Sequence, residues 1–104
     1  MTNASFLVKN GELYGFHLEG HSTNDAGDDE GRALCAAVSS AAYMAANTIT
    51  EIAGDTAAVE IGEGTMSFEV SSPSDKTKVI LEGLRLHLRE LSKQYGTRLN
   101  ITEV

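Results

Sequence analysis

Apolar and polar residues alternate in two pairs of short segments, which is the pattern of half-buried β-strands. The first pair flanks an Asn-Gly dipeptide at 10–11, which favours the tight turn of a β-hairpin. The second pair flanks a Gly-Glu-Gly sequence at 62–64, and a short alternating tail follows near the end of the chain. We therefore predict two hairpins and a terminal edge strand, at residues 6–9, 13–18, 57–61, 66–70 and 98–102.

Two longer segments repeat apolar residues every three or four positions, the spacing of a helix with one apolar face. The first runs over residues 34–52, with Gly54 as a C-terminal cap, and it is so rich in alanine that we expect it to be largely buried. The second begins after Pro73, with Ser74 as N-cap, and ends at Gly96. The apolar positions are Leu34, Val38, Ala41, Ala45, Ile49 and Ile52 in the first helix, and Thr77, Leu81, Leu84, Leu88, Leu91 and Tyr95 in the second.

The predicted elements follow one another in the order β-β-α-β-β-α-β. Two amphipathic helices of this kind can cover one face of a sheet. The expected fold class is therefore α/β of the α+β type, a two-layer sandwich with two helices on a mostly antiparallel five-stranded sheet. A chain of 104 residues fits one such core, so we expect a single domain over residues 1–104.

Composition and charge narrow the classes of function. The chain is 41% hydrophobic and 22% charged, close to ordinary globular values, and we expect a cytoplasmic protein without a membrane segment. Its net charge of −7 repels a phosphate backbone, which argues against direct binding of nucleic acid and favours a basic partner. Its single cysteine excludes an internal disulfide and a cysteine-rich zinc site, and no cofactor is expected.

Cys35 is the strongest candidate for chemistry. The glycine-rich and acidic stretch at 20–31 lacks apolar periodicity and is predicted to be a loop, so Cys35 would lie in the first turn of the helix that follows. The positive end of a helix dipole favours a thiolate, and His21 is available upstream as a base that titrates near neutral pH. A lone cysteine in an alanine-rich helix is, however, more often a buried apolar residue than a nucleophile.

Other polar residues leave several alternatives open. Ser39 lies one turn after Cys35 on the same helix face and can donate to a thiolate or a substrate carbonyl, or bond back to its own helix. His17, Glu19 and His21 share one strand face, but their spacing along an extended strand disfavours joint metal coordination. The acidic stretch also lacks the regular ligand spacing of a calcium loop. We predict no metal site.

The residues Gly20-His21, the acidic loop, and the run Cys35-Ala36-Ala37-Val38-Ser39 together resemble the signature of the ribosomal-processing cysteine protease family (Prp, also called YsxB-like). The predicted order of strands and helices is similar to that family over essentially the whole chain. This resemblance implies a cytoplasmic endopeptidase that removes an N-terminal extension from a large-subunit ribosomal protein. It also implies a homodimer and a basic precursor peptide as partner.

The resemblance assigns roles by position. Cys35 would be the nucleophile and His21 the general base, with Gly20 and Ser39 as supporting residues. The chain departs from the family where an aspartate commonly stands three residues before the cysteine, because Arg32 occupies that position, and its loop is about two residues longer. Asp28, Asp29 or Glu30 would then have to substitute for the missing aspartate.

Two other readings of the same residues are a non-catalytic module that binds a ribosomal or other basic peptide, and a thiol redox sensor. The second is disfavoured because the chain holds no second cysteine to resolve a sulfenic acid.

Overall fold

The computed structural model describes residues 1–20 and 27–104. These ranges form strands and helices in the predicted order. The strands are β1 Thr2–Lys9, β2 Glu12–Gly20, β3 Ala57–Gly62, β4 Thr65–Val70 and β5 Leu99–Glu103; the helices are α1 Asp29–Asn47, which continues into the π-helical turn η1 Thr48–Ile52, and α2 Asp75–Tyr95, which is followed by the 3-10 turn η2 Gly96–Arg98.

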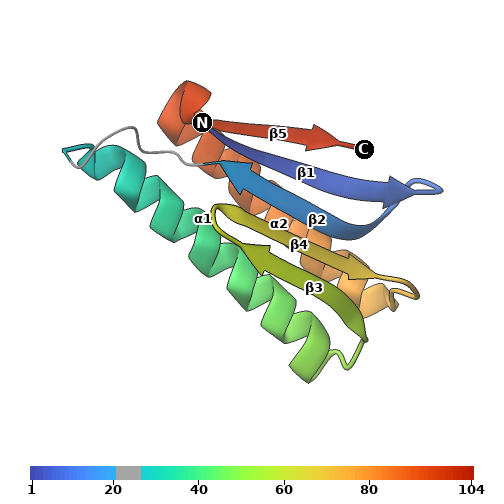
Figure 1. Cartoon of the computed structure of the whole chain (residues 1–104). Coiled ribbons are helices and arrows are strands. Elements are labelled where there is room, and N and C mark those ends of the chain that lie inside the picture. Colours follow the sequence, from blue (N-terminus) through green and yellow to red (C-terminus); the bar gives the residue numbers. More distant parts are fainter. Residues whose placement is uncertain (21–26) are drawn as a thin grey trace.

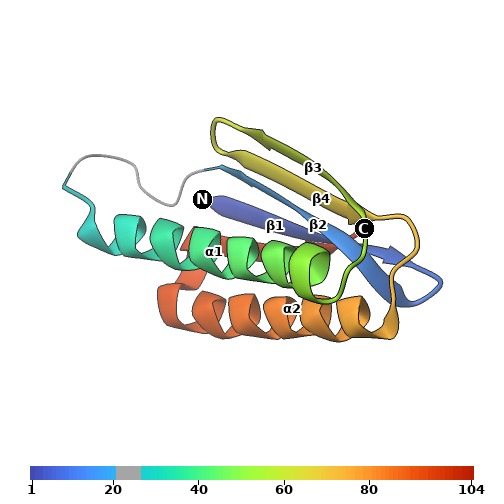
Figure 2. The same cartoon turned by 90° about the horizontal axis from the view of Figure 1, so that it is seen from below.

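The strands form one sheet in the order β3-β4-β2-β1-β5. All neighbouring pairs are antiparallel except β1 and β5, which run parallel. Figures 1 and 2 show α1 and α2 side by side and antiparallel on one face of this sheet. The predicted two-layer α+β sandwich, with a terminal strand at the sheet edge, is confirmed.

Both predicted hairpins are present. Asn10 and Gly11 have φ values of 54° and 78°, the positive pair that a tight two-residue turn matching the strand twist requires. In the second hairpin, β3 and β4 are joined through Glu63 and Gly64, and Gly64 has φ 71°. The turn residues in the sequence therefore determine where each strand reverses.

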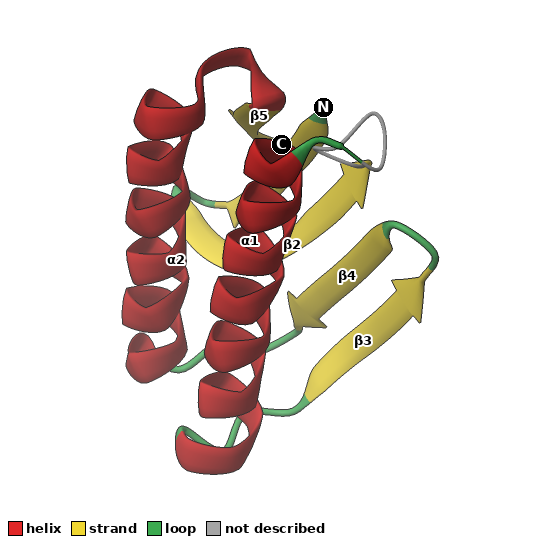
Figure 3. Cartoon of the chain, turned by 90° about the vertical axis from the view of Figure 1, so that its left-hand side faces the viewer, coloured by secondary structure: helices red, strands yellow, loops and turns green. Residues whose placement is uncertain are grey.

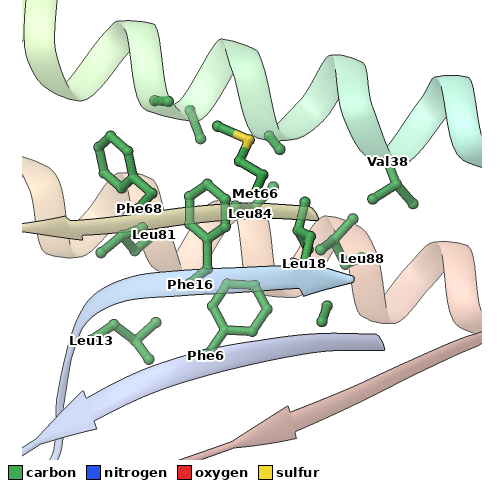
Figure 4. Close-up of a cluster of buried hydrophobic side chains, with 14 of the residues drawn as sticks. Phe6, Leu13, Phe16, Leu18, Val38, Met66, Phe68, Leu81, Leu84 and Leu88 are labelled. Atoms are coloured by element: carbon green, nitrogen blue, oxygen red, sulfur yellow. The ribbon is translucent and has the colours of Figure 1, made fainter. Parts of the chain in front are cut away.

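Three phenylalanines from neighbouring strands form the centre of the core (Figure 4). Phe16 of β2 lies between Phe6 of β1 and Phe68 of β4, with ring centroids 6.4 and 5.3 Å away, and all three side chains are fully buried. From the helix layer, Leu34 and Leu81 pack into the same cluster. Burial of such side chains contributes roughly 1.5–3 kcal/mol each, so this cluster holds the two layers together.

The start of α2 is braced by a carboxylate from outside the helix. Ser74 is the N-cap, as predicted, and its side chain accepts a hydrogen bond from the Thr77 N–H. Asp55 Oδ2 accepts from the Ser74 N–H at 2.8 Å, the Thr77 hydroxyl at 2.5 Å and the Ser74 hydroxyl at 2.9 Å. These hydrogen bonds stabilise the carboxylate and so hold the pKa of Asp55 below its ordinary value. The bond from the Ser74 N–H has the largest effect.

The predicted start of α1 is wrong by five residues. The helix begins at Asp29, after the N-cap Asp28, so residues 29–31 are helical and Gly20 belongs to β2 rather than to a loop. The Asp28 side chain accepts the Gly31 N–H at 3.0 Å. Acidic residues suit the first turn because they face the positive end of the helix dipole. Acidic residues without apolar periodicity thus form a helix start here.

The end of α1 also differs from the prediction. Leu34, Val38 and Ile49 are buried as expected, but Ile52 is 79% exposed. The helix closes there with an Ala53 N–H to Thr48 carbonyl bond of 2.8 Å. Ile52 lies within this wider π-type turn, which shifts it off the apolar face of the helix. Gly54, with φ 82°, then ends the helix as predicted.

The expectation that α1 is largely buried is wrong, because one face of the helix is open to solvent. Over Asp29–Ile52 the chain is long and apolar enough, by length and composition alone, to cross a membrane. Core helices of soluble domains meet the same criterion, and residues such as Leu34 and Val38 pack within the core of this fold. The helix is therefore only weak evidence for a membrane segment.

Candidate active site

A groove of about 280 Å³ lies between the middle of α1 and the sheet. One wall is formed by α1, where Cys35, Ser39 and Tyr43 recur at intervals of four residues and so share one helix face. The other wall consists of the end of β2 and the turn between β3 and β4. The residues lining the groove are Thr2, Leu18, Glu19, Gly20, Cys35, Val38, Ser39, Tyr43, Ile61, Gly62, Gly64, Thr65 and Met66.

Cys35 is partly exposed and lines this groove. It is the seventh residue of α1, which places it in the second turn and about 9 Å along the axis from Asp29. The prediction that it lies in the first turn is therefore wrong, because the helix begins earlier. The helix dipole acts mainly within the first turn, so the groove surroundings matter more for this thiol than the helix start does.

Two amides near the start of α1 have partners within the helix start itself. The Gly31 N–H donates to the Asp28 side chain, and the Arg32 N–H donates to the Asp28 carbonyl at 3.1 Å. Both amides are therefore used in the helix start and are not available to bind an oxyanion. The Ser39 hydroxyl, which lines the groove beside Cys35, is a donor of the type that an oxyanion needs.

Gly20 ends β2 at the edge of the groove. Its N–H donates to the Gly64 carbonyl at 3.0 Å, which ties the strand end to the β3–β4 turn. Its φ of 96° favours glycine, and a Cβ atom at this position would clash with the Met1 carbonyl oxygen. The next residue, His21, lies outside the described residues, and so do the residues up to 26.

The charged candidates lie at the beginning of α1, one to two turns before Cys35. Asp28 caps the helix and forms an ion pair with Arg98, whereas Asp29 and Arg32 pair with each other on the surface. Asp29 is 90% exposed, and Asp28 is 13% exposed. The structure thus brings Cys35, Ser39 and Gly20 together in the groove and places these three charged residues at the start of the helix.

The predicted shared strand face of His17 and Glu19 is confirmed. Glu19 Oε2 lies 3.4 Å from His17 Nε2, and His17 Nδ1 lies 2.6 Å from Ser67 Oγ. His21, the third member of the metal alternative, lies outside the described part of the chain. The polar contacts of His17 across β2 and β4 account for its position without a ligand.

Sequence reasoning missed three residues that the fold brings to this region. Tyr43 lies eight positions after Cys35, so the helical spacing already held a signal for it. Ile61, 60% exposed, lines the opposite wall. Arg98 reaches Asp28 across 70 positions, and no local pattern in the sequence indicates such a contact.

Comparison with known proteins places the groove in context. Residues 1–100 match the family model described as cysteine protease Prp. The chain belongs to this family. A search of curated proteins gave no match. Membership of the Prp family identifies the chain as a cysteine-type endopeptidase, and it carries a single cysteine, which lines the groove.

Solved structures share the fold at low sequence identity. The chain resembles the ribosomal processing protease Prp from S. aureus, crystallised with a covalently linked product peptide, at TM-score 0.87 and 18% identity over all of both chains. The same protease with a substrate peptide gives TM-score 0.87 and 16% identity, again over all of both chains. A Streptococcus mutans protein gives 0.85 and 23%, over all of this chain and 97% of the other. These likenesses support the fold.

Proposed function

We propose that this chain removes the N-terminal extension of a large-subunit ribosomal protein during ribosome maturation, with Cys35 as nucleophile and His21 as general base. The observation that carries the proposal is the position of Cys35, partly exposed in a groove between α1 and the sheet. A nucleophile needs access to an extended peptide, and a groove with polar and apolar walls offers it. The S. aureus relative was crystallised with peptides.

The proposed reaction has two stages. The Cys35 thiolate attacks the scissile carbonyl carbon, the amide bond breaks, and protonated His21 gives its proton to the leaving amine. Water, deprotonated by His21, then attacks the thioester and releases the new carboxyl end together with the thiolate. Ser39, one turn after Cys35 on the groove wall, is proposed to donate to the developing oxyanion.

Charge favours encounter with a basic substrate. The chain has a net charge of −7. Ribosomal proteins are basic as a class, so long-range attraction would raise the association rate and weaken with added salt. Cleavage rates that are insensitive to ionic strength would contradict this part of the proposal.

The test is cleavage of a synthetic peptide that spans the N-terminal extension and first mature residues of a large-subunit ribosomal protein from the same genome. The expected result is one cut at the extension boundary by the wild type, none by Cys35→Ala, and retained binding of the peptide by that variant. Continued cleavage by Cys35→Ala would contradict the proposed nucleophile. Full cellular function of Cys35→Ala would instead favour a peptide-binding role.

Two further expectations accompany the proposal. We propose a cytoplasmic location, where ribosome assembly takes place, and a homodimer, as the family resemblance implies. Light scattering coupled to size exclusion measures the second directly, and a mass of one chain at micromolar concentration would contradict it.

A further inference from the structure

The start of α1 is held by an ion pair from the other end of the chain. Asp28 Oδ1 accepts the Gly31 N–H at 3.0 Å, and Asp28 Oδ2 accepts from Arg98 Nη1 at 2.5 Å. The side chains of Asp28 and Arg98 are 13% and 32% exposed. One carboxylate therefore caps the helix that carries Cys35 and also binds it to a residue 70 positions away.

Arg98 is itself fixed relative to the groove. It is the last residue of η2, directly before β5, and its neighbour Leu99 pairs with Thr2, which pairs in turn with Gly20 at the end of β2. Thr2 and Gly20 both line the groove. In Figure 3 the end of α2, the turn after it and the start of α1 lie at the same end of the molecule. Arg98 thus connects the sheet side of the groove to the helix side.

The Asp28–Arg98 ion pair is shielded enough from solvent to influence the position of the start of α1. Exposed ion pairs are weak because solvent screens them, but loss of one partner from a shielded pair leaves a charge without its compensation. Cys35 lies seven residues after Asp28, about 10 Å along a rigid helix. A shift of the first turn therefore carries the thiol with it, relative to the wall formed by β2 and the β3–β4 turn.

We propose that Arg98 is a positioning residue for the protease. Through its ion pair with Asp28, it sets where the first two turns of α1, and so the Cys35 thiol, stand against the groove wall. This inference rests on the proposed function, in which Cys35 is the nucleophile. Misplacement of a reacting group by about 1 Å can lower the reaction rate roughly a hundredfold.

Arg85 offers a control elsewhere in the chain, although its partner Glu103 also pairs with Arg89. Its Nη1 lies 2.5 Å from Glu103 Oε1, so it also ties a helix to β5 through an arginine and a carboxylate, and its side chain is 23% exposed. This pair connects α2 with the far end of β5, away from Leu99 and the groove. Arg85→Gln removes a bridge of the same kind without touching the start of α1.

The experiment compares Arg98→Gln, Arg98→Lys, Asp28→Asn and Arg85→Gln with the wild type. Peptide cleavage gives kcat and KM, and urea unfolding gives the folded fraction at assay temperature. We expect Arg98→Gln and Asp28→Asn to lower kcat roughly tenfold to a hundredfold with KM changed less than about twofold. Arg98→Lys should recover part of the loss, because it keeps the positive charge. Arg85→Gln should lower stability less, because Glu103 is 44% exposed and keeps its pair with Arg89, and it should leave kcat unchanged.

The double variant Asp28→Asn with Arg98→Gln tests the coupling directly. Its kcat should be no lower than that of either single variant, because both remove the same pair. Equal kcat values for Arg98→Gln and Arg85→Gln, or no recovery with Arg98→Lys, would overturn the inference. Cleavage that survives Cys35→Ala would overturn the proposed function instead, so the two failures are distinguishable.

The positioning role of Arg98 can also be tested without a substrate, in case the chosen precursor peptide is not cleaved. The rate at which iodoacetamide alkylates Cys35 depends on the exposure of the thiol and on the charges around it. Arg98→Gln should change this rate at least threefold relative to Arg85→Gln at equal folded fraction. Identical alkylation rates for the two variants would overturn the positioning role.

Discussion

The two long helices begin with the same kind of capping contacts, but these contacts have different roles. At each start a side-chain oxygen caps the helix and a carboxylate links it to a distant segment: Asp28 with Arg98 at α1, and Ser74 with Asp55 at α2. Because the helices are antiparallel, their starts lie at opposite ends of the molecule (Figure 2). The contacts at the start of α2 support stability, whereas those at the start of α1 hold the helix that carries Cys35.

The largest effects should come from the first apolar anchors of the two helices. Leu34→Ala and Leu81→Ala each remove a fully buried side chain, and each should lower the free energy of unfolding by about 2–5 kcal/mol. Leu34 precedes Cys35, so its loss should also reduce kcat per folded molecule, whereas Leu81→Ala should not. Urea unfolding and cleavage assays measure both, and equal specific activities would contradict the distinction.

Loss of the α2 cap should have a moderate effect. Ser74→Ala removes the oxygen that accepts the Thr77 N–H, and a lost cap typically costs about 1 kcal/mol. Ser74→Thr keeps the oxygen and serves as the control. The urea midpoint should fall in the first variant and stay close to the wild type in the second. A fall in kcat with either would show that the α2 start also affects the groove.

The hydrogen bonds of Asp55 at the start of α2 should make the stability of the fold depend on pH. The pKa of Asp55 lies below its ordinary value in the folded protein, so the carboxylate stabilises the fold fully above pH 3.8, and this contribution is lost as the pH falls through the lowered pKa. Urea midpoints measured down to about pH 2 should fall less steeply in Asp55→Asn than in the wild type. Parallel curves for the two proteins would contradict the assignment.

The smallest effect should follow Arg32→Ala. Arg32 pairs with Asp29 on the exposed side of α1, three positions apart, and such pairs contribute about 0.2–0.5 kcal/mol. The free energy of unfolding should change within that range, and the cleavage rate should stay near that of the wild type. A strong loss of activity would indicate that Arg32 replaces the family aspartate in function as well as in position.

The comparison of the two helix starts also shows what the sequence reveals. The start of α2 was predictable because Pro73 and Ser74 are local signals that precede an apolar stripe. The start of α1 was missed because its cap is an aspartate within an acidic stretch, which has the composition of a loop. The contact that fixes it, between Asp28 and Arg98, joins residues far apart in the chain.

The candidate site also has one part that the sequence indicates and one part that it does not. Cys35 and Ser39 could be placed on one face from helical spacing, and both line the groove. The opposite wall, with Gly20 and the β3–β4 turn, depends on strand order and on the Gly20 to Gly64 bond, which no local pattern encodes. The assignment of His21 as the base stays a prediction from the family resemblance.

The central claim is that Cys35 forms the covalent intermediate, and a trapping experiment tests it most directly. The wild type, Cys35→Ser and Ser39→Ala would be incubated with the precursor peptide carrying a chloromethyl ketone at the scissile position, and then analysed by intact-mass and peptide-mapping mass spectrometry. The account predicts one adduct per chain, on Cys35, and complete loss of cleavage in step with labelling. An adduct at another residue, or full cleavage by labelled protein, would contradict it.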